Sequence, residues 1–373
     1  MATFSSSSIL FSFVFSLATV AIHVAEGTGE QSPVLFIFGD STVDVGTNNF
    51  LNTRAKANFP YYGIDFPHST PTGRFSNGFN TADQIARLFG YKCSPPPFLA
   101  LEKHPYSFKK NILKGVNFGS AGSGILRETG LRQWGEVVFL EKQVQQFALV
   151  QGNITETLGP KRTAYYLSKA LFLISIGAND LFDYSRNQSG SIRLGKQEYL
   201  TALQQNFYVQ IKKLYELGAR KFGIVGIAAI GCCPAMRAQN YANGGGCVTE
   251  LNDFAHAFYL ATQSLLNRLS SELKDIKYSH SNTIAMTFPV LQTPQLYGIK
   301  DTESACCGLG KFNGEGPCSQ LNHTDLCKNR TDHLFWDWFH PSEKASELAA
   351  LTLFQGGSQF MTPINFSQLA RSP

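Results

Sequence analysis

Four short apolar runs constrain the fold of this chain more than any other feature of its sequence. Each is apolar on both faces of an extended strand, and they cover residues 34–38, 171–177, 221–231 and 283–288. Runs of this kind suit a parallel sheet that is covered on two sides. Leucine and phenylalanine recur at helical spacing in the segments 200–217 and 251–273, which we expect to be two of the covering helices.

Strands that alternate with helices predict a right-handed, doubly wound α/β sandwich of three layers with a parallel sheet. We see no repeat, linker or compositional break after residue 27, so residues 28–373 are expected to form a single domain. Folds of this class place their sites beyond the carboxyl ends of the strands. Candidate residues are therefore sought where the apolar runs end.

Residues 1–27 resemble a secretory signal peptide. Their apolar core, Ile9–Ile22, is too short to span a bilayer comfortably, although an uncleaved anchor is the alternative. No later segment is apolar for long enough to cross a membrane, and the C-terminus carries neither a retention signal nor a lipid-attachment site. Export also makes the Asn-X-Ser/Thr sequons relevant as glycosylation sites, and these begin at Asn153, Asn187, Asn322, Asn329 and Asn365.

The cysteines favour disulfides over a zinc site. All 8 follow residue 27, and no Cys-X-X-Cys pair occurs. Cys232 and Cys247 bracket a loop rich in Asn and Gly, so we expect them to pair. Cys306, Cys307, Cys318 and Cys327 are then expected to pair among themselves, which leaves Cys93 with Cys233 by elimination.

The charge pattern excludes one class of partner. The formal net charge is +5, and the 32 basic residues are scattered rather than gathered into a patch, so nothing points to nucleic acid. We expect a monomer that uses no cofactor and no metal.

Three polar residues suggest nucleophilic catalysis. Ser41 follows the first apolar run in the stretch "FGDSTVDVG", at the place where this architecture presents ligands. Near the other end, Asp337 and His340 stand three residues apart in "FWDWFHPSE", just before a helix expected to start with Pro341. A serine hydroxyl needs a base, and the base needs an orienting partner. Ser41, His340 and Asp337 supply these three parts.

Acyl transfer also needs donors for an oxyanion. The Gly-rich stretch "GVNFGSAGSGI" begins at Gly115, and the backbone N–H of Gly119 is one candidate. Asn179, in "GAND", follows the run that starts at Leu171, and its side-chain amide is a second candidate. We therefore expect Gly119 and Asn179 to lie near Ser41.

From about Pro33 to about Phe354 the chain resembles the plant-type GDSL esterases/lipases of the SGNH hydrolase superfamily. The order and spacing of six blocks match: the stretch around Ser41, "PTGRFSNG", "GVNFGSAGSGI", "GAND", "ACCGLG" and "FWDWFHPSE". The resemblance implies a flavodoxin-like α/β/α fold and a secreted enzyme of the apoplast or cell wall that acts on small-molecule or lipid esters. It also implies that Ser41 is both nucleophile and first oxyanion donor, beside Gly119 and Asn179.

The chain departs from the family pattern in two places. Thr42 stands where the family has leucine, and Thr47 replaces the first Asn of a Gly-Asn-Asn-Asn run. Neither position has a chemical role in the expected reaction, but Thr42 can change the shape of the pocket floor.

Several other interpretations stay open at this level. Asp40 could be a phosphoacceptor or a metal ligand at a strand end, and His333, Asp337 and His340 have the spacing of a metal site on a helix. The same triad would also serve an acyltransferase, in which an alcohol replaces water as the acceptor. A non-catalytic secreted binding protein is the remaining alternative.

Overall fold

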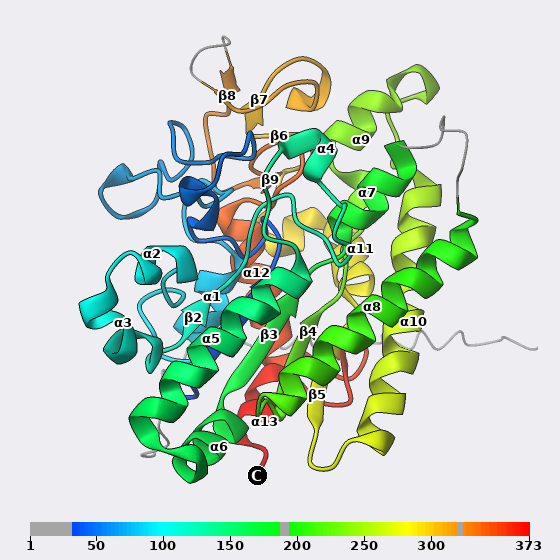
Figure 1. The fold of residues 1–373 in the computed structure, drawn as a ribbon. Coiled ribbons are helices and arrows are strands. Elements are labelled where there is room, and N and C mark those ends of the chain that lie inside the picture. The colour runs from blue at the N-terminus through cyan, green and yellow to red at the C-terminus, as the bar shows by residue number, and fades with distance from the viewer. Residues whose placement is uncertain (1–31, 187–193, 320–323) are drawn as a thin grey trace, which may run out of the picture. The chain divides into compact units, whose positions relative to one another are not determined.

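The computed structural model describes residues 32–186, 194–319 and 324–373, and residues 32–373 form one compact unit. A six-stranded sheet runs through it in the order β10-β5-β4-β3-β1-β2 (Figure 1). All neighbours in this sheet are parallel except β10, which pairs antiparallel with β5. The strands are β1 (Leu35–Gly39), β2 (Val116–Asn117), β3 (Leu171–Ser175), β4 (Lys221–Val225), β5 (Lys277–Ser281) and β10 (Met361–Thr362).

The remaining strands form two small sheets outside the main one. One pairs β6 (Asp301–Ala305) with β9 (His333–Phe335), and the other pairs β7 (Cys307–Gly308) with β8 (Asp325–Leu326). The α-helices are α1 (Thr81–Leu88), α2 (Phe98–Glu102), α3 (Pro105–Ile112), α4 (Leu131–Trp134), α5 (Leu140–Leu158), α6 (Pro160–Lys169), α7 (Ala178–Arg186), α8 (Lys196–Glu216), α9 (Pro234–Gln239), α10 (Thr249–Glu272), α11 (Thr283–Gln292), α12 (Glu343–Gln355) and α13 (Phe366–Arg371).

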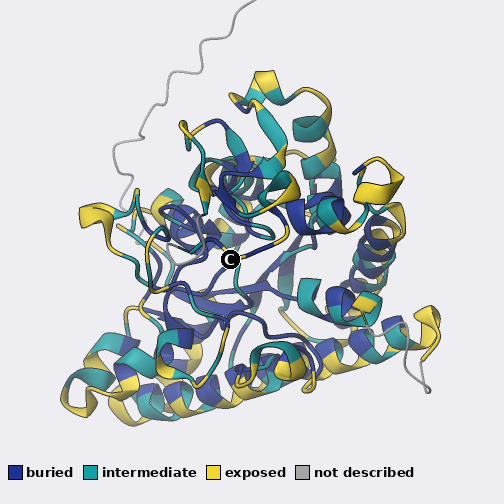
Figure 2. Cartoon of the chain, turned by 90° about the horizontal axis from the view of Figure 1, so that it is seen from above, coloured by how far each residue is buried: buried dark blue, intermediate teal, exposed yellow. Residues whose placement is uncertain are grey.

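The two faces of the sheet bury alternate residues of the same strands. On β1, Phe36 and Phe38 pack into a core with α5, α8 and α10, whereas Leu35 and Ile37 pack into a core with α1, α12 and α13. Figure 2 shows the strands buried along their length, while the long helices also carry exposed residues. The expected three-layer α/β/α sandwich is therefore confirmed, and its parallel strands follow the flavodoxin-like order 2-1-3-4-5.

The expected helices over 200–217 and 251–273 are confirmed as α8 and α10. The expected strand at 283–288 is wrong, because these residues lie in helix α11. The side chain of Asn282 accepts a hydrogen bond from the N–H of Ala285 and caps this helix. The strand in this region is β5, just before the helix. Its sequence, Lys-Tyr-Ser-His-Ser, is mostly polar, so a search for apolar runs does not detect it. Their burial is compensated by hydrogen bonds such as the one from His280 Nδ1 to Gln263 Oε1, 3.1 Å long.

The apolar run 221–231 is only partly a strand. β4 ends at Val225, and residues 226–230 line the cavity described below. Helix α12 begins at Glu343, two residues after the expected start, with Ser342 as its N-cap. The expected signal peptide lies outside the described residues. Within those residues, no helix is both long and apolar enough to span a membrane.

Three disulfides form, two of them near the end of the chain. Cys232 pairs with Cys247, as expected, and the other four cysteines pair among themselves, also as expected: Cys306 with Cys327 and Cys307 with Cys318. The expected pair of Cys93 with Cys233 is wrong, since both thiols are free. They lie in different environments: Cys93 is near Arg74 and Asp83, whereas buried Cys233 is near Asp337 and Arg186.

Removal of the Cys232–Cys247 disulfide is expected to lower stability. The bridge closes a 15-residue interval, and loop-closure entropy predicts a loss of about 3 kcal/mol in the free energy of unfolding for the double alanine variant. Urea unfolding followed by circular dichroism measures this difference. Cys93→Ala, which breaks no bridge, is the control. An unchanged urea midpoint in the double variant would show that the loop is ordered without its bridge.

Candidate active site

Ser41 lies two residues beyond the end of β1, where the backbone leaves the sheet. The turn requires glycine at position 39, because φ is +149° there and a Cβ atom would lie 2.1 Å from the carbonyl oxygen of Ser175. The N–H groups of Val43 and Asp44 then donate to the carbonyl oxygen of Asp40, which forms a helical turn. Ser41 therefore stands near the start of a short helical turn at the carboxyl edge of the sheet.

His340 and Asp337 belong to the turn between β9 and α12. The Asp337 Oδ1 atom accepts hydrogen bonds from the backbone N–H groups of Phe339 and His340, each 2.9 Å long. These bonds fold residues 337–340 back on themselves, so that the carboxylate lies beside the imidazole of His340. One short turn thus carries both groups.

The structure brings Ser41, His340 and Asp337 together in one chain of hydrogen bonds. The His340 Nδ1 atom lies 2.7 Å from Asp337 Oδ1 and 2.9 Å from Oδ2, and His340 Nε2 lies 2.8 Å from Ser41 Oγ. A carboxylate only accepts, which assigns the proton to Nδ1 and leaves Nε2 to accept from the serine hydroxyl. In this tautomer the imidazole can take the proton of Ser41.

The environment of Asp337 keeps its carboxyl group ionised although no part of it is exposed. Burial acts to raise the pKa of Asp337, but the neighbouring His340, the N–H of Phe339 and the hydroxyl of Tyr62 together lower it below the usual value. The imidazole therefore faces a negative charge that can stabilise an imidazolium.

The expected donor Gly119 does not face this site. Its N–H donates to the side chain of Asn117 over 2.8 Å, and Gly119 is not among the residues that line the cavity at Ser41. Gly122, three residues on in the same Gly-rich loop, does line that cavity. Its φ is +79°, and a Cβ atom on it would lie 2.5 Å from Trp134 Cδ1, so a glycine is required. Sequence alone did not distinguish these two glycines.

The N–H groups of Ser41 and Gly122 make no hydrogen bond to any residue that the structure describes. Asn179, at the start of α7, also lines the cavity. One proton of its Nδ2 donates to the carbonyl oxygen of Ser123 over 2.9 Å, which leaves the second proton for another acceptor. Three N–H bonds without a partner among the described residues thus belong to residues that line the cavity of Ser41.

Two buried carboxylates hold the loop that carries Gly122. Asp44 accepts from the N–H of Ala121 over 2.9 Å, and Asp180 accepts from the N–H groups of Ile125 and Leu126 over 2.9 and 3.1 Å. Burial raises the pKa of Asp44 to about 6 and that of Asp180 to about 7. Both lie within the motifs named above, Asp44 three residues after Ser41 and Asp180 one residue after Asn179, so their place in the sequence already marks them as candidates for the site.

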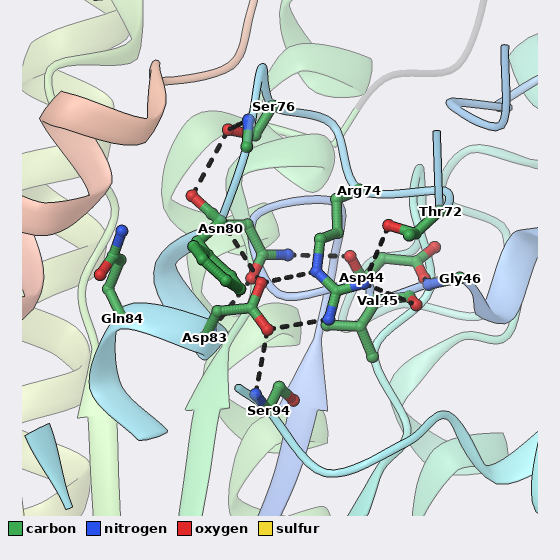
Figure 3. Close-up of polar contacts among 12 residues, drawn as sticks. Asp44, Val45, Gly46, Thr72, Arg74, Ser76, Asn80, Asp83, Gln84 and Ser94 are labelled. Carbon is green, nitrogen blue, oxygen red and sulfur yellow. Dashed lines mark hydrogen bonds and ion pairs between the residues drawn. The ribbon is translucent and has the colours of Figure 1, made fainter. Parts of the chain in front are cut away.

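The motif "PTGRFSNG" connects the two halves of the site. Arg74 makes two hydrogen bonds to Asp83, of 2.6 and 2.8 Å, and also reaches Val45 and Thr72 (Figure 3). The ring centroid of Phe75 lies 4.8 Å from that of His340. Asn77 accepts the N–H of Glu343, the first residue of α12. This motif therefore braces the loop of Ser41 against the turn of His340.

A cavity of about 580 Å³ contains Ser41 and His340 in its wall. This volume lies in the usual range for small-molecule sites, about 300–1,000 Å³. Most of its lining is apolar or aromatic and includes Tyr62, Phe75, Phe182, Ile227, Met286 and Leu348. Thr42 also lines the cavity, and its hydroxyl bonds to Asp40 Oδ1 over 2.8 Å and to Ser175 Oγ over 2.9 Å.

The alternative metal site on His333, Asp337 and His340 is not assembled. His333 bonds instead to Asp332 over 2.9 Å and lies 3.8 Å from Asp301. Within the described residues, the cluster with ligand-like spacing is Cys306, Cys327 and His333, but its two cysteines form a disulfide and offer no thiolate. Asp40 is buried and bonds to Thr42, with no metal-ligand cluster around it in the part of the chain that the structure describes.

Comparison with known proteins identifies the family. The sequence profile of the family described as GDSL-like Lipase/Acylhydrolase matches residues 35–353. The chain belongs to this GDSL family. It is 37% identical over 361 residues to GDSL esterase/lipase At5g55050 of Arabidopsis thaliana, an alignment that covers 93% of this chain and 92% of that protein. With GDSL esterase/lipase LTL1 of the same plant the identity is 36%, over 95% of both chains.

Proposed function

We propose that this GDSL protein is a secreted carboxylic-ester hydrolase that works through an acyl-enzyme on Ser41. The observation that carries the proposal is the continuous chain of hydrogen bonds from Ser41 through His340 to buried Asp337, in the wall of a largely apolar cavity. The names of the relatives, all esterase/lipases, support the same reaction class. The apolar lining suits the acyl part of an ester.

In the proposed reaction, the Ser41 oxygen attacks the ester carbonyl carbon while its proton moves to His340 Nε2. The N–H groups of Ser41 and Gly122 and the free Nδ2 proton of Asn179 bind the resulting oxyanion. Collapse of this intermediate breaks the bond to the alcohol, which takes the proton from His340 and leaves. Water then attacks the acyl-enzyme with His340 as base, and the carboxylic acid is released.

Labelling with a fluorophosphonate tests the nucleophile directly. The reagent should modify Ser41 alone, which peptide mass spectrometry can locate, and the protein should hydrolyse a series of p-nitrophenyl esters. Modification at another serine, or no hydrolysis of any ester, would contradict the proposal. Product analysis with an added acceptor alcohol separates hydrolysis from acyl transfer, since only a transferase would give a new ester as its main product.

We also propose that the chain is exported and glycosylated. Three disulfides favour an oxidising compartment. Of the five sequons, Asn187 and Asn322 lie outside the described residues, Asn153 lies in α5, Asn365 caps α13, and Asn329 is exposed.

Protein made in a secretory host is expected to lose apparent mass when an endoglycosidase removes its N-linked glycans. Asn329→Gln should remove one glycan, because the side chain is exposed on an irregular segment. Gel mobility and intact-mass spectrometry measure both changes. Unmodified asparagine at all five sequons in exported protein would contradict this prediction.

A further inference from the structure

We propose that Tyr62 is a positioning residue that orients the Asp337 carboxylate and thereby extends the hydrogen-bond chain of Ser41 and His340 by one member. This inference rests on the proposed function, since it concerns how the same base is held. Tyr62 lies far from Asp337 in sequence, yet its hydroxyl donates to Asp337 Oδ2 over 2.7 Å in a buried contact. Nothing in the sequence motifs marked this residue.

Without Tyr62, the two carboxylate oxygens of Asp337 would have different numbers of hydrogen-bond donors. Oδ1 accepts from His340 Nδ1 and from the backbone N–H groups of Phe339 and His340. Among the described residues, Oδ2 accepts only from the Tyr62 hydroxyl and from His340 Nδ1, the latter over the longer distance of 2.9 Å. Without the Tyr62 hydroxyl, the buried Oδ2 atom would have His340 Nδ1 as its single donor, and Oδ1 shares that donor. Burial of a charged oxygen with so few hydrogen bonds costs free energy.

Tyr62 is held rigidly enough to orient another group. Its N–H donates to the carbonyl oxygen of Phe59 over 3.1 Å, and its ring makes edge contacts with Phe59 and Phe75, with centroids 5.3 and 5.7 Å away. Phe75 in turn lies against the ring of His340. The same aromatic cluster therefore holds both the donor to Asp337 and the imidazole that Asp337 orients.

The following loop residues fix this cluster to the turn of His340. The N–H of Gly63 donates to Ser76, and Asp65 pairs with Arg330 through two bonds of 2.7 Å. The Asp65 carboxylate also accepts from Asn77 Nδ2, and Asn77 Oδ1 accepts from the N–H of Glu343 at the start of α12. The position of Tyr62 is thus coupled to the position of His340 by contacts that do not involve substrate.

The hydroxyl of Tyr62 remains a donor at every pH at which the enzyme would work. Burial, together with the adjacent charge of Asp337, raises the pKa of Tyr62 well above 10. The titratable groups that face Asp337 are Tyr62, His340 and the thiol of Cys233. Burial raises the pKa of Cys233 to about 12, so this thiol stays neutral and does not contribute to the acid side of the pH profile.

The test is Tyr62→Phe, which removes one oxygen and keeps the ring. Measured on a soluble short-chain p-nitrophenyl ester, kcat is expected to fall about 10- to 100-fold, the effect of losing one hydrogen bond to a charged group, with KM nearly unchanged. Because the Tyr62 hydroxyl helps to lower the pKa of Asp337, its loss raises that pKa. Activity should therefore be lost at a higher pH on the acid side of the profile.

Tyr61→Phe is the matched control. Tyr61 is the adjacent residue, and its hydroxyl makes no hydrogen bond within the described residues, so kcat and the pH profile should not change. In an Asp337→Ala background, which has no acceptor, Tyr62→Phe should cause no further loss of kcat. An additional loss there would overturn the inference.

The other outcomes are also decisive. A Tyr62→Phe variant with a lower melting temperature but unchanged kcat and pH profile would show a purely structural role and overturn the inference. So would a rise in KM alone, which would show that the Tyr62 hydroxyl contributes to substrate binding and not to the orientation of Asp337. Either result leaves the esterase function intact, whereas a wild-type protein that hydrolyses no ester would overturn the proposed function and this inference with it.

Discussion

Ser41→Ala and His340→Ala are each expected to lower kcat by about 10⁶-fold, the loss typical of a member of a catalytic triad. Ser41 Oγ and His340 Nε2 are 2.8 Å apart, so the serine can lose its proton only to this imidazole within the described site. Without the base the hydroxyl is a weak nucleophile, and without the hydroxyl the base has nothing to activate. Asp337→Asn should reduce kcat less, because the carboxylate orients and stabilises the imidazole without reacting.

The double variant is the sharpest form of this prediction. If the two residues act as one unit, Ser41→Ala with His340→Ala should be no slower than either single variant. A double variant that is slower by the product of the two effects would show that the residues act independently, and the triad would be wrong. Two measurements test this prediction. One is the steady-state rate of p-nitrophenyl butyrate hydrolysis, and the other is the extent of fluorophosphonate labelling.

Folding controls separate this loss from damage to the structure. Both side chains lie at the wall of the cavity, so circular dichroism and the melting temperature of the two single variants should stay close to those of the wild type. Ser358→Ala and His256→Ala replace the same residue types at exposed positions and should keep full activity. Full activity in Ser41→Ala would place the nucleophile elsewhere in the chain.

The sheet and the place of Ser41 at its carboxyl edge could be predicted from sequence because their signals are local. β1, β3 and β4 are buried on both faces and read as apolar runs, and Ser41 is adjacent to the end of the first. β5 could not be predicted in this way, because its buried residues include two serines and a histidine. Hydrogen bonds compensate for the burial of these polar side chains, so the strand has no apolar run. The apolar run that follows β5, residues 283–288, resembles a buried strand in sequence. It belongs instead to helix α11, which Asn282 caps.

The parts of the site that could not be predicted depend on contacts between distant segments. Gly119 and Gly122 lie in the same Gly-rich stretch, and only the structure shows that the N–H of Gly119 donates to Asn117 while Gly122 lines the cavity. Tyr62 meets Asp337 through tertiary packing, with no spacing rule to relate them. The free thiols likewise show the limit of pairing by elimination, since an even number of cysteines does not require that all of them pair.

The second large effect is expected at Asn179. Asn179→Ala should lower kcat by about 10²- to 10³-fold, or about 3–4 kcal/mol in transition-state stabilisation, the usual loss for one oxyanion donor. KM should change little, because the negative oxygen exists only after attack by Ser41. The side chain suits this role since Ser123 engages only one of its two Nδ2 protons.

Asn179→Asp makes the prediction more demanding. The aspartate has nearly the same shape, but it replaces a donor with a negative charge, so the loss of kcat should be at least as large as in Asn179→Ala. Asn206→Ala is the control, because that asparagine is exposed and, among the described residues, its side chain bonds only to the backbone of its own helix. Steady-state kinetics should be combined with the affinity for an alkyl boronic acid, whose tetrahedral adduct on Ser41 resembles the intermediate. If both Asn179 variants kept wild-type kcat and boronate affinity, the oxyanion would be held by the N–H groups of Ser41 and Gly122 alone.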